Sequence, residues 1–199
     1  MSVGIDEAGR GCLYGPVFAA AVYVENPIED PIPPITIKTW DSKKLSEKKR
    51  DILFEYIHNY ASCVKVKMID SKTIDEINIL NSTMKAMHGA IDQIDGHIEH
   101  LYVDGNQFFE YKRDNAFIPY TCIPKGDDIN HLIGMASIIA KVSRDRYIAE
   151  ECKNNPLLYD YEIDRNKGYG TKAHIDAIKN NGPLVNHRKT FNKVKEFVN

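Results

Sequence analysis

The stretch "VGIDEAGRGCLYGPVFAAAVYV", residues 3–24, holds two apolar runs joined by a glycine-rich turn. We expect residues 1–5 and 16–24 to form two strands, with the neighbouring acids Asp6 and Glu7 at the end of the first. Acids beside glycine are ordinary in a solvated turn. They also suit a metal site, because hard divalent cations bind carboxylate oxygens and glycine lets a backbone approach a phosphate closely. These two residues do not decide between the two interpretations.

Strands and helices alternate along the rest of the chain. Residues 129–152 predict a helix whose first half is apolar nearly all round, which is typical of a helix at the centre of a fold. Ser46 is a good N-cap for another helix, and a striped pattern predicts a third from Asn78 to about Asp95. The other expected elements are a proline-rich loop over 26–35, strands over 36–40, 63–69, 100–106 and 117–124, a loop over 161–171, a helix over 171–180 and a basic tail. This order predicts an α/β sheet covered by helices.

Length and composition exclude several classes of protein. The chain has 199 residues, 43% of them hydrophobic, enough for one domain or a domain with a small appendage. A net charge of −2 argues against a generally basic nucleic-acid coat protein, although basic residues crowd 38–50 and 165–195. Four scattered cysteines without a CxxC pair predict a reduced, cytoplasmic protein. The apolar stretch 12–24 is too short to span a bilayer, so no membrane association is expected.

Acids end three separate predicted strands: Asp6 with Glu7, then Asp104, then Asp127. Ligands of such sheets sit beyond strand ends, so these carboxylates can converge although they are distant in sequence. Acids without a matching cluster of His or Cys favour Mg²⁺ or Mn²⁺ over zinc. Adjacent side chains on a regular strand point to opposite faces, so Asp6 and Glu7 are expected to share a site only if the strand bends.

Other patterns carry less information. The spacing from Gly9 to Gly15 misses the dinucleotide fingerprint by one residue and follows two acids, which would repel a pyrophosphate. His97 and His100 lack further ligands and are interpreted as incidental. His187 is expected to support the basic tail, and the "RDR" of 144–146 to form a structural ion-pair cluster.

Seven motifs occur in order between Val3 and Phe191: "DEAGRG", "DSKKLSEKKR", "YVDGN", "KGD", "ASIIAKVSRDR", "KGYGT" and "HRKTF". With them the chain strongly resembles the type 2 ribonucleases H, specifically bacterial-type ribonuclease HII. The resemblance implies a ribonuclease H-like fold, with a mixed sheet flanked by helices over 1–155 and a small C-terminal helical region with a substrate-contacting loop over 156–199. It also implies an endonuclease that hydrolyses the RNA strand of RNA–DNA hybrids. Such an enzyme nicks on the 5′ side of single ribonucleotides in duplex DNA, leaving 5′-phosphate and 3′-hydroxyl ends.

The resemblance also implies roles for individual residues. Asp6, Glu7, Asp104 and Asp127 match the family's catalytic acids, which hold two divalent ions, Mg²⁺ or Mn²⁺. We expect Asp6 to bridge the two ions, which suits in-line hydrolysis of a phosphodiester. The implied substrate-binding residues are Gly9, Arg10 and Gly11 as the 2′-hydroxyl reader, Tyr169 against the next sugar, and Ser42, Lys43 and Ser46 on the DNA backbone. Taken alone, Arg10 could be a solvated side chain and Tyr169 could simply close a turn.

The chain departs from the family pattern without losing an acid. Cys12 and Tyr14 replace a proline and a small residue, Gly134 and Met135 replace an alanine pair, and Asn166 replaces a histidine. Because Tyr14 is close in sequence to the expected 2′-hydroxyl reader, junction preference is the property it would change.

Two other functions remain open from the residues. The chain could recognise hybrids without cutting them, or could be a nuclease of the same superfold with another substrate. A monomer is expected, and a sliding-clamp-type partner is left open.

Overall fold

The computed structural model describes residues 1–25 and 39–198. Its main sheet has the order β3-β2-β1-β4-β7, and β5 and β6 form a separate two-stranded ribbon. The strands are β1 (Ser2–Ala8), β2 (Val17–Tyr23), β3 (Cys63–Ile69), β4 (His100–Asp104), β5 (Lys112–Arg113), β6 (Ala116–Phe117) and β7 (Tyr120–Ile123). The α-helices are α1 (Glu47–Tyr60), α2 (Ser71–Ile91), α3 (Gly126–Ile129), α4 (His131–Asn154), α5 (Ile163–Asn166), α6 (Lys172–Asn181) and α7 (Asn192–Lys195), and the 3-10 helices are η1 (Ser42–Lys44) and η2 (Pro156–Tyr161).

The sheet is mixed, as expected. β1 pairs antiparallel with β2, and β2 antiparallel with β3. On its other side β1 pairs parallel with β4, and β4 parallel with β7. Three parallel strands therefore have their carboxyl ends at one edge of the sheet, the arrangement in which α/β proteins bind ligands.

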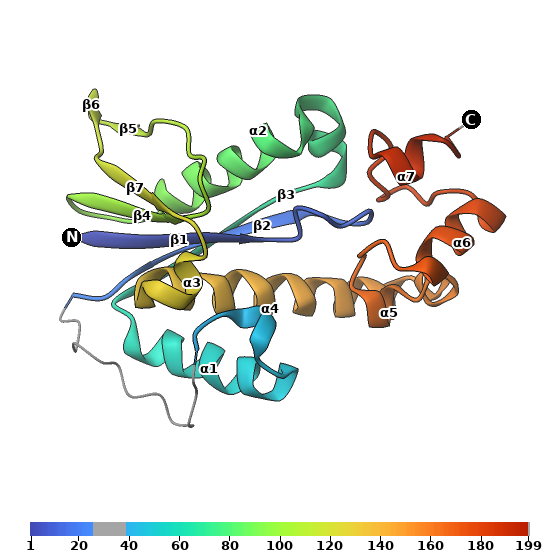
Figure 1. The fold of residues 1–199 in the computed structure, drawn as a ribbon, viewed down its shortest axis with the longest axis horizontal. Coiled ribbons are helices and arrows are strands. Elements are labelled where there is room, and N and C mark those ends of the chain that lie inside the picture. Colours follow the sequence, from blue (N-terminus) through green and yellow to red (C-terminus); the bar gives the residue numbers. More distant parts are fainter. Residues whose placement is uncertain (26–38, 199) are drawn as a thin grey trace.

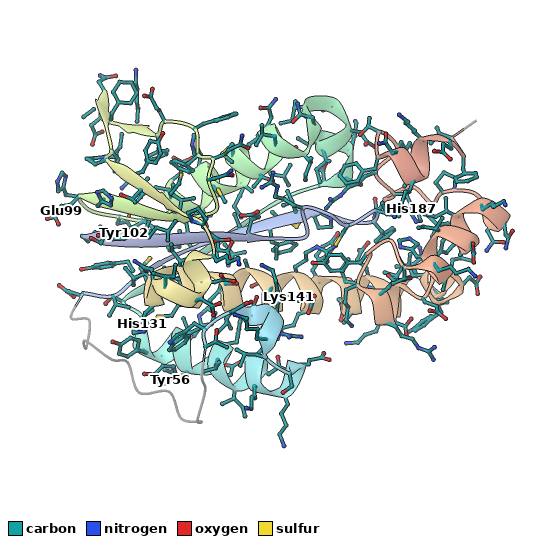
Figure 2. The ribbon with its side chains drawn as sticks, in the orientation of Figure 1. Tyr56, Glu99, Tyr102, His131, Lys141 and His187 are labelled. Atoms are coloured by element: carbon teal, nitrogen blue, oxygen red, sulfur yellow. The ribbon has the colours of Figure 1, made fainter. Side chains whose placement is uncertain are left out.

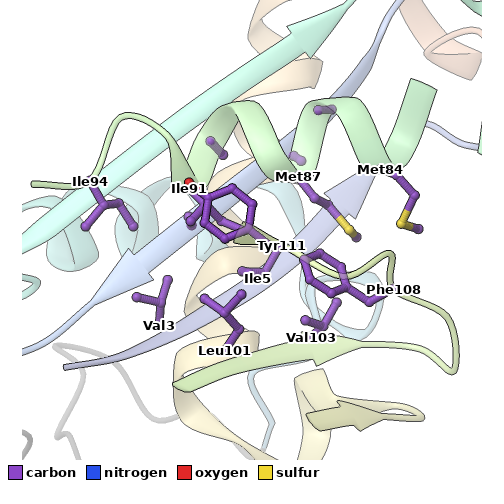
Figure 3. Close-up of a cluster of buried hydrophobic side chains, with 14 of the residues drawn as sticks. Val3, Ile5, Met84, Met87, Ile91, Ile94, Leu101, Val103, Phe108 and Tyr111 are labelled. Atoms are coloured by element: carbon purple, nitrogen blue, oxygen red, sulfur yellow. The ribbon is translucent and has the colours of Figure 1, made fainter. Parts of the chain in front are cut away.

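Helices cover both faces of the sheet (Figure 1). On one face α2 packs against side chains of β1 and β4, including Ile5, Leu101 and Val103, with Met87 and Ile91 from the helix (Figure 3). On the other face Ala20 and Val22 of β2 pack with residues of α1 and α4. Alternate residues of a strand point to opposite faces, which is why β2 is apolar throughout.

The central helix is α4, as its all-round apolar pattern predicts. Asn130 caps it by accepting from the backbone N–H groups of Leu132 and Ile133. It also crosses β1 very closely, since a Cβ added at Gly4 would lie 2.2 Å from the backbone carbon of Leu132. The prediction of a buried central helix is confirmed.

Helix α2 begins earlier than its stripe predicts. Asp70 caps its first turn by accepting from Thr73 N. Asn78, the expected start, has φ 64 and ψ 167, and its side chain accepts from Asn81 N. Asn78 is therefore the cap of the second part of a kinked helix, and the sequence pattern detected only that part.

Other boundaries also differ from expectation. β1 runs on to Ala8, so Asp6 and Glu7 lie within it rather than after it. The expected strand over 36–40 falls mainly outside the described residues, and Thr39 and Trp40 are not in a strand. The expected loop over 161–171 contains α5.

The last helices gather at one end of the molecule (Figure 1). Their core joins residues of α4 to η2, α5 and α6, and includes Leu13 and Tyr14 from the glycine-rich segment. His187 and Arg188, assigned to a basic tail from sequence, are instead buried, with 1% and 0% of their surfaces exposed. In the described part of the chain, no helix is both long and apolar enough to cross a membrane.

Candidate active site

Asp6 and Glu7 reach the same pocket without the expected bend. β1 remains in register with β2 through Ala8, so it is a regular strand at both acids. Its pairing with β4 ends at Ile5 opposite Val103, however. Beyond that point the β4 side of β1 is open, which lets side chains from both faces approach the carboxyl end of β4.

Asp104 and Asp127 come from the next two elements at this edge. Asp104 is the last residue of β4, and its Oδ1 accepts a 2.7 Å hydrogen bond from Gly126 N. That bond ties the turn after β7 to β4. Asp127 follows in the first turn of α3, rather than at the strand end as expected.

A pocket of about 210 Å³ opens here. Three of the four expected acids line it: Asp6, Glu7 and Asp104. The expected substrate-binding residues in the lining are Gly9, Arg10, Gly11, Ser42, Lys43 and Tyr169. The other lining residues are Ala8, Ser137 and Lys141. Asp127 lies beside the lining, since its Oδ2 is 3.8 Å from Lys43 Nζ.

The carboxylates share an electrostatic environment. Burial raises the pKa of Asp6 well above its ordinary value, and the charges of Glu7 and Asp104 raise it further. Burial also raises the pKa of Glu7, against the lowering effect of Arg10. The pKa of Asp127 is raised by burial and then by the charge of Asp104. These groups are costly to ionise together without a cation.

Lys43 is a cation beside this cluster, with Nζ 3.8 Å from Asp127 Oδ2. Its own burial lowers its pKa, but the charges of Asp127 and Asp6 outweigh that effect and raise the pKa overall. Ser42 beside it is buried, with its Oγ 2.9 Å from that of Ser137 on α4. Ser46 is not part of the pocket lining, and its side chain caps α1 by accepting from Lys49 N.

The Gly9–Gly11 turn passes over a buried guanidinium. Gly9 has φ 91, and a Cβ there would lie 2.1 Å from Arg144 Nε. Arg144 donates to the carbonyl oxygens of Pro16, Lys167 and Tyr14 at 3.0, 2.8 and 3.0 Å. The expected ion-pair cluster at 144–146 is therefore wrong for Arg144, which clasps two loops, and right for its two neighbours in sequence. Asp145 pairs with Lys141, and Arg146 with Asp51 and Glu55.

A second buried arginine supports the same turn. Arg188 donates to the carbonyl oxygens of Gly15 and Arg10 at 2.9 and 2.8 Å. Its Nη2 is buried and has no hydrogen-bond partner among the described residues. Arg10 itself reaches outward, with Nη1 3.5 Å from Glu7 Oε1.

Tyr169 lines the same pocket as this turn. Its backbone forms a β-bridge with Cys12, and its ring is 43% exposed. Asn166 shapes the preceding turn by accepting from Gly168 N and donating to the Tyr161 carbonyl.

Tyr14 does not line the pocket, although it is close in sequence to the expected 2′-hydroxyl reader. Its ring is 1% exposed and packs edge-on against His187, and its hydroxyl is 3.4 Å from Glu151 Oε2. The larger side chain is therefore accommodated in the C-terminal core.

Two lining residues on α4, Ser137 and Lys141, were missed from sequence. Lys141 Nζ is 2.8 Å from Asp145 Oδ1 and 5.7 Å from the centre of the Tyr169 ring, and Figure 2 labels it on α4. The available signal was a lysine within the apolar first half of this helix.

The residues present fit hard divalent ions. Asp127 Oδ2 is buried and accepts no hydrogen bond among the described residues, and the donors are carboxylate oxygens. In the described ranges 1–25 and 39–198, no three His, Cys, Asp or Glu side chains stand in ready-made metal-ligating geometry. Ionised carboxylates repel one another until a cation neutralises them, and their oxygens are the donors that hard divalent cations prefer.

Comparison with known proteins agrees with this geometry. The family model for ribonuclease HII matches residues 3–195. A ribonuclease HII of Caldicellulosiruptor bescii is 46% identical over 190 residues, covering 96% of this chain and 85% of that protein. One of Phocaeicola vulgatus is 42% identical, covering 96% and 89%. The crystal structure of the ribonuclease H2 from Pyrococcus horikoshii superposes with a TM-score of 0.74 at 23% identity, covering 98% of this chain and 96% of that one. The Bst-RNase HIII structure in complex with Mn²⁺ superposes with a TM-score of 0.68 at 19% identity, covering 98% and 68%. The family match and these relatives together show that the chain belongs to the ribonuclease HII family.

Proposed function

We propose that this ribonuclease H hydrolyses the RNA strand of RNA–DNA hybrids and also nicks duplex DNA on the 5′ side of a single embedded ribonucleotide, leaving 5′-phosphate and 3′-hydroxyl ends. The observation that carries the proposal is the meeting of three acids in one pocket with a glycine turn, a lysine and an exposed tyrosine. The acids supply a metal site, and the other groups supply contacts for a sugar–phosphate chain.

Asp6, Glu7, Asp104 and Asp127 would hold two divalent ions, Mg²⁺ or Mn²⁺. When bound, such ions would activate a water and stabilise the leaving 3′-oxygen. Asp6 is the most buried of the four acids, and the charges of Glu7 and Asp104 raise its pKa further, so it would be the acid that both ions share.

The chain's other residues would bind and orient the substrate. The backbone of Gly9 and Gly11 can approach a ribose 2′-hydroxyl closely, and Arg10 can pair with the adjacent phosphate. Tyr169 offers an aromatic face to the next sugar. Ser42 and Lys43 would contact the DNA backbone at the pocket, with Ser46 at the end of the same segment.

The two regions of the chain would contribute different parts of the site. Residues 1–155 would supply the acids and the glycine turn, and residues 156–199 the loop that carries Tyr169. We also propose that the protein is a monomer, which gel filtration of the protein alone tests. A sliding-clamp-type partner is a separate proposal, which gel filtration of a mixture with a clamp tests. A solved structure of an archaeal relative, from Archaeoglobus fulgidus, is titled as a complex with PCNA.

A labelled DNA duplex that contains one ribonucleotide tests the proposed function. With Mg²⁺ the wild-type protein should nick it on the 5′ side of the ribonucleotide, and Asp104→Asn should lower the rate at least about a hundredfold. Asp128→Asn is the matched control, because Asp128 neighbours Asp127 but pairs with Lys44 and Thr39 outside the pocket. Binding without a nick would support a non-cleaving hybrid-binding protein. Cleavage confined to all-DNA or all-RNA duplexes would support another nuclease of the same superfold.

A further inference from the structure

Two fully buried histidines meet behind the candidate active site. His174 of α6 is 0% exposed and His187 is 1% exposed, and their Nε2 atoms are 2.9 Å apart. Figure 2 labels His187 among the C-terminal helices. Neither side chain lines the pocket that holds the acids. The proposed chemistry therefore leaves this pair without a role.

The partners of the outer nitrogens define the tautomer of each ring. Leu184 N donates to His187 Nδ1 at 2.8 Å, so this nitrogen carries no proton. In the neutral ring the proton is then on His187 Nε2, which donates to His174 Nε2. That leaves the His174 proton on Nδ1, which donates at 2.9 Å to the carbonyl oxygen of Tyr169. The result is a directed relay of three hydrogen bonds that ends on Tyr169.

The surroundings of the pair favour the neutral form of both rings. Burial lowers the pKa of His187, with a further contribution from His174, to about 3, and burial lowers that of His174 as well. Tyr14 and Tyr161 pack against the pair, Glu151 lies beyond Tyr14, and Arg188 follows His187 in the sequence. Glu151 is engaged by Tyr14 and Asn186, and Arg188 by backbone carbonyls. The relay is therefore intact at neutral pH.

We propose that His174, held in one tautomer by His187, is a positioning residue that sets the orientation of Tyr169 over the pocket. The Tyr169 carbonyl accepts from both Thr171 N and His174 Nδ1, at 2.8 and 2.9 Å. Because the ring is 43% exposed, its direction depends strongly on how the backbone beneath it is held. The inference rests on the proposed function, in which Tyr169 packs against the substrate sugar.

A double-mutant cycle tests whether His174 acts through Tyr169. On the single-ribonucleotide duplex, His174→Leu should lower kcat/KM roughly fivefold or more, mainly through KM, because it removes a buried donor. In a Tyr169→Ala background the same change should alter kcat/KM less than about twofold. His174→Asn should restore most of the activity, since its amide nitrogen can occupy the place of Nδ1. Multiplicative losses in the cycle, or no rescue by asparagine, would overturn the inference.

Ile178→Ala serves as the matched control. Ile178 is a fully buried residue of the same helix and the same C-terminal core, but its side chain takes no part in the three hydrogen bonds of the relay. The variant should lose stability while KM stays close to the wild-type value when assayed well below its Tm. An equal rise in KM would mean that any loosening of this core moves Tyr169.

Nitrogen NMR of the histidine-labelled wild-type protein tests the relay without a variant. His187 should show a protonated Nε2 and His174 a protonated Nδ1 at pH 7. A charged ring, or a His174 protonated on Nε2, would refute the relay whatever the activity of the protein. The wild-type protein could show these tautomers and yet neither bind nor cut a ribonucleotide-containing duplex. That result would refute the proposed function but not the hydrogen-bonded relay.

Discussion

Replacing Arg144 should destabilise the protein strongly, although no acid pairs with it. The side chain is 1% exposed and donates three hydrogen bonds, all to backbone carbonyls of two loops. Arg144→Met keeps a long unbranched side chain but removes every donor. Arg144→Lys keeps the charge but loses the planar fork that reaches three acceptors at once.

The magnitude follows from the groups left without partners. Three buried carbonyl oxygens at about 1–3 kcal/mol each give a gross loss of roughly 3–9 kcal/mol. Removing a buried charge returns part of this, because taking a guanidinium out of water costs several kcal/mol. We expect a net loss of about 3–5 kcal/mol for Arg144→Met, which lowers Tm by roughly 6–20 °C in a chain of this size. Arg144→Lys should lose about half as much or more.

Urea denaturation followed by circular dichroism measures these losses. Arg146→Met is the matched control, two residues further along α4, where the side chain is 49% exposed. Its ion pair with Glu55, at 3.2 Å, and its contact with the Phe54 ring make a loss of about 0.5–1.5 kcal/mol the expectation. If Arg144→Lys unfolded at the wild-type urea concentration, or if the Arg146 variant lost as much as Arg144→Met, the clasp would not be what stabilises these loops.

Three further outcomes are expected. Asp6→Asn should abolish cleavage yet raise the free energy of unfolding of the metal-free protein by about 1 kcal/mol at pH 7, measured in EDTA, since it removes a buried charge. Because the folded-state pKa of Asp6 is raised, the metal-free wild type should lose stability as pH rises above about 4, the unfolded-state value, and a pH series of Tm should show a smaller loss in this variant. Gly4→Ala should cost at least about 2 kcal/mol in urea melts because its Cβ would overlap the Leu132 backbone, whereas Gly11→Ala, which meets open space, should stay within about 0.5 kcal/mol.

Hydrophobic periodicity predicted which faces of the helices and strands are buried better than it predicted where those elements begin and end. The apolar surround of α4 and the alternation of β3 follow from which faces are buried, and short-range spacing records that information. The start of α2 depends instead on a cap at Asp70 and a kink at Asn78, which a hydrophobic stripe does not record. β1 extends past Asp6 because its partner β2 continues, and that depends on pairing across the sheet.

Some features of the candidate site could likewise be predicted from the sequence, and others could not. Convergence of Asp6 and Asp104 could be anticipated because parallel strands end at one edge, and the strong family resemblance supplied the remaining expectations. The clasp by Arg144 joins residues separated by 130 and 23 positions, and the histidine pair spans 13. No local pattern distinguishes such an arginine from one that pairs with a neighbouring acid, so the ion-pair interpretation was the natural error.

Two buried arginines place positive charge beside the site, which the chain's net charge of −2 does not reveal. Arg144 and Arg188 lie beneath the Gly9–Gly11 turn, and their donors are directed at carbonyl oxygens rather than at carboxylates. Neutral acceptors leave the positive charge uncompensated, so two cations lie against a turn that lines the same pocket as the acids. Two fixed positive charges would favour the approach of a nucleic-acid phosphate to this pocket, in addition to the divalent ions that the acids would hold. The same side chains that hold the turn rigid would therefore also favour the approach of the substrate.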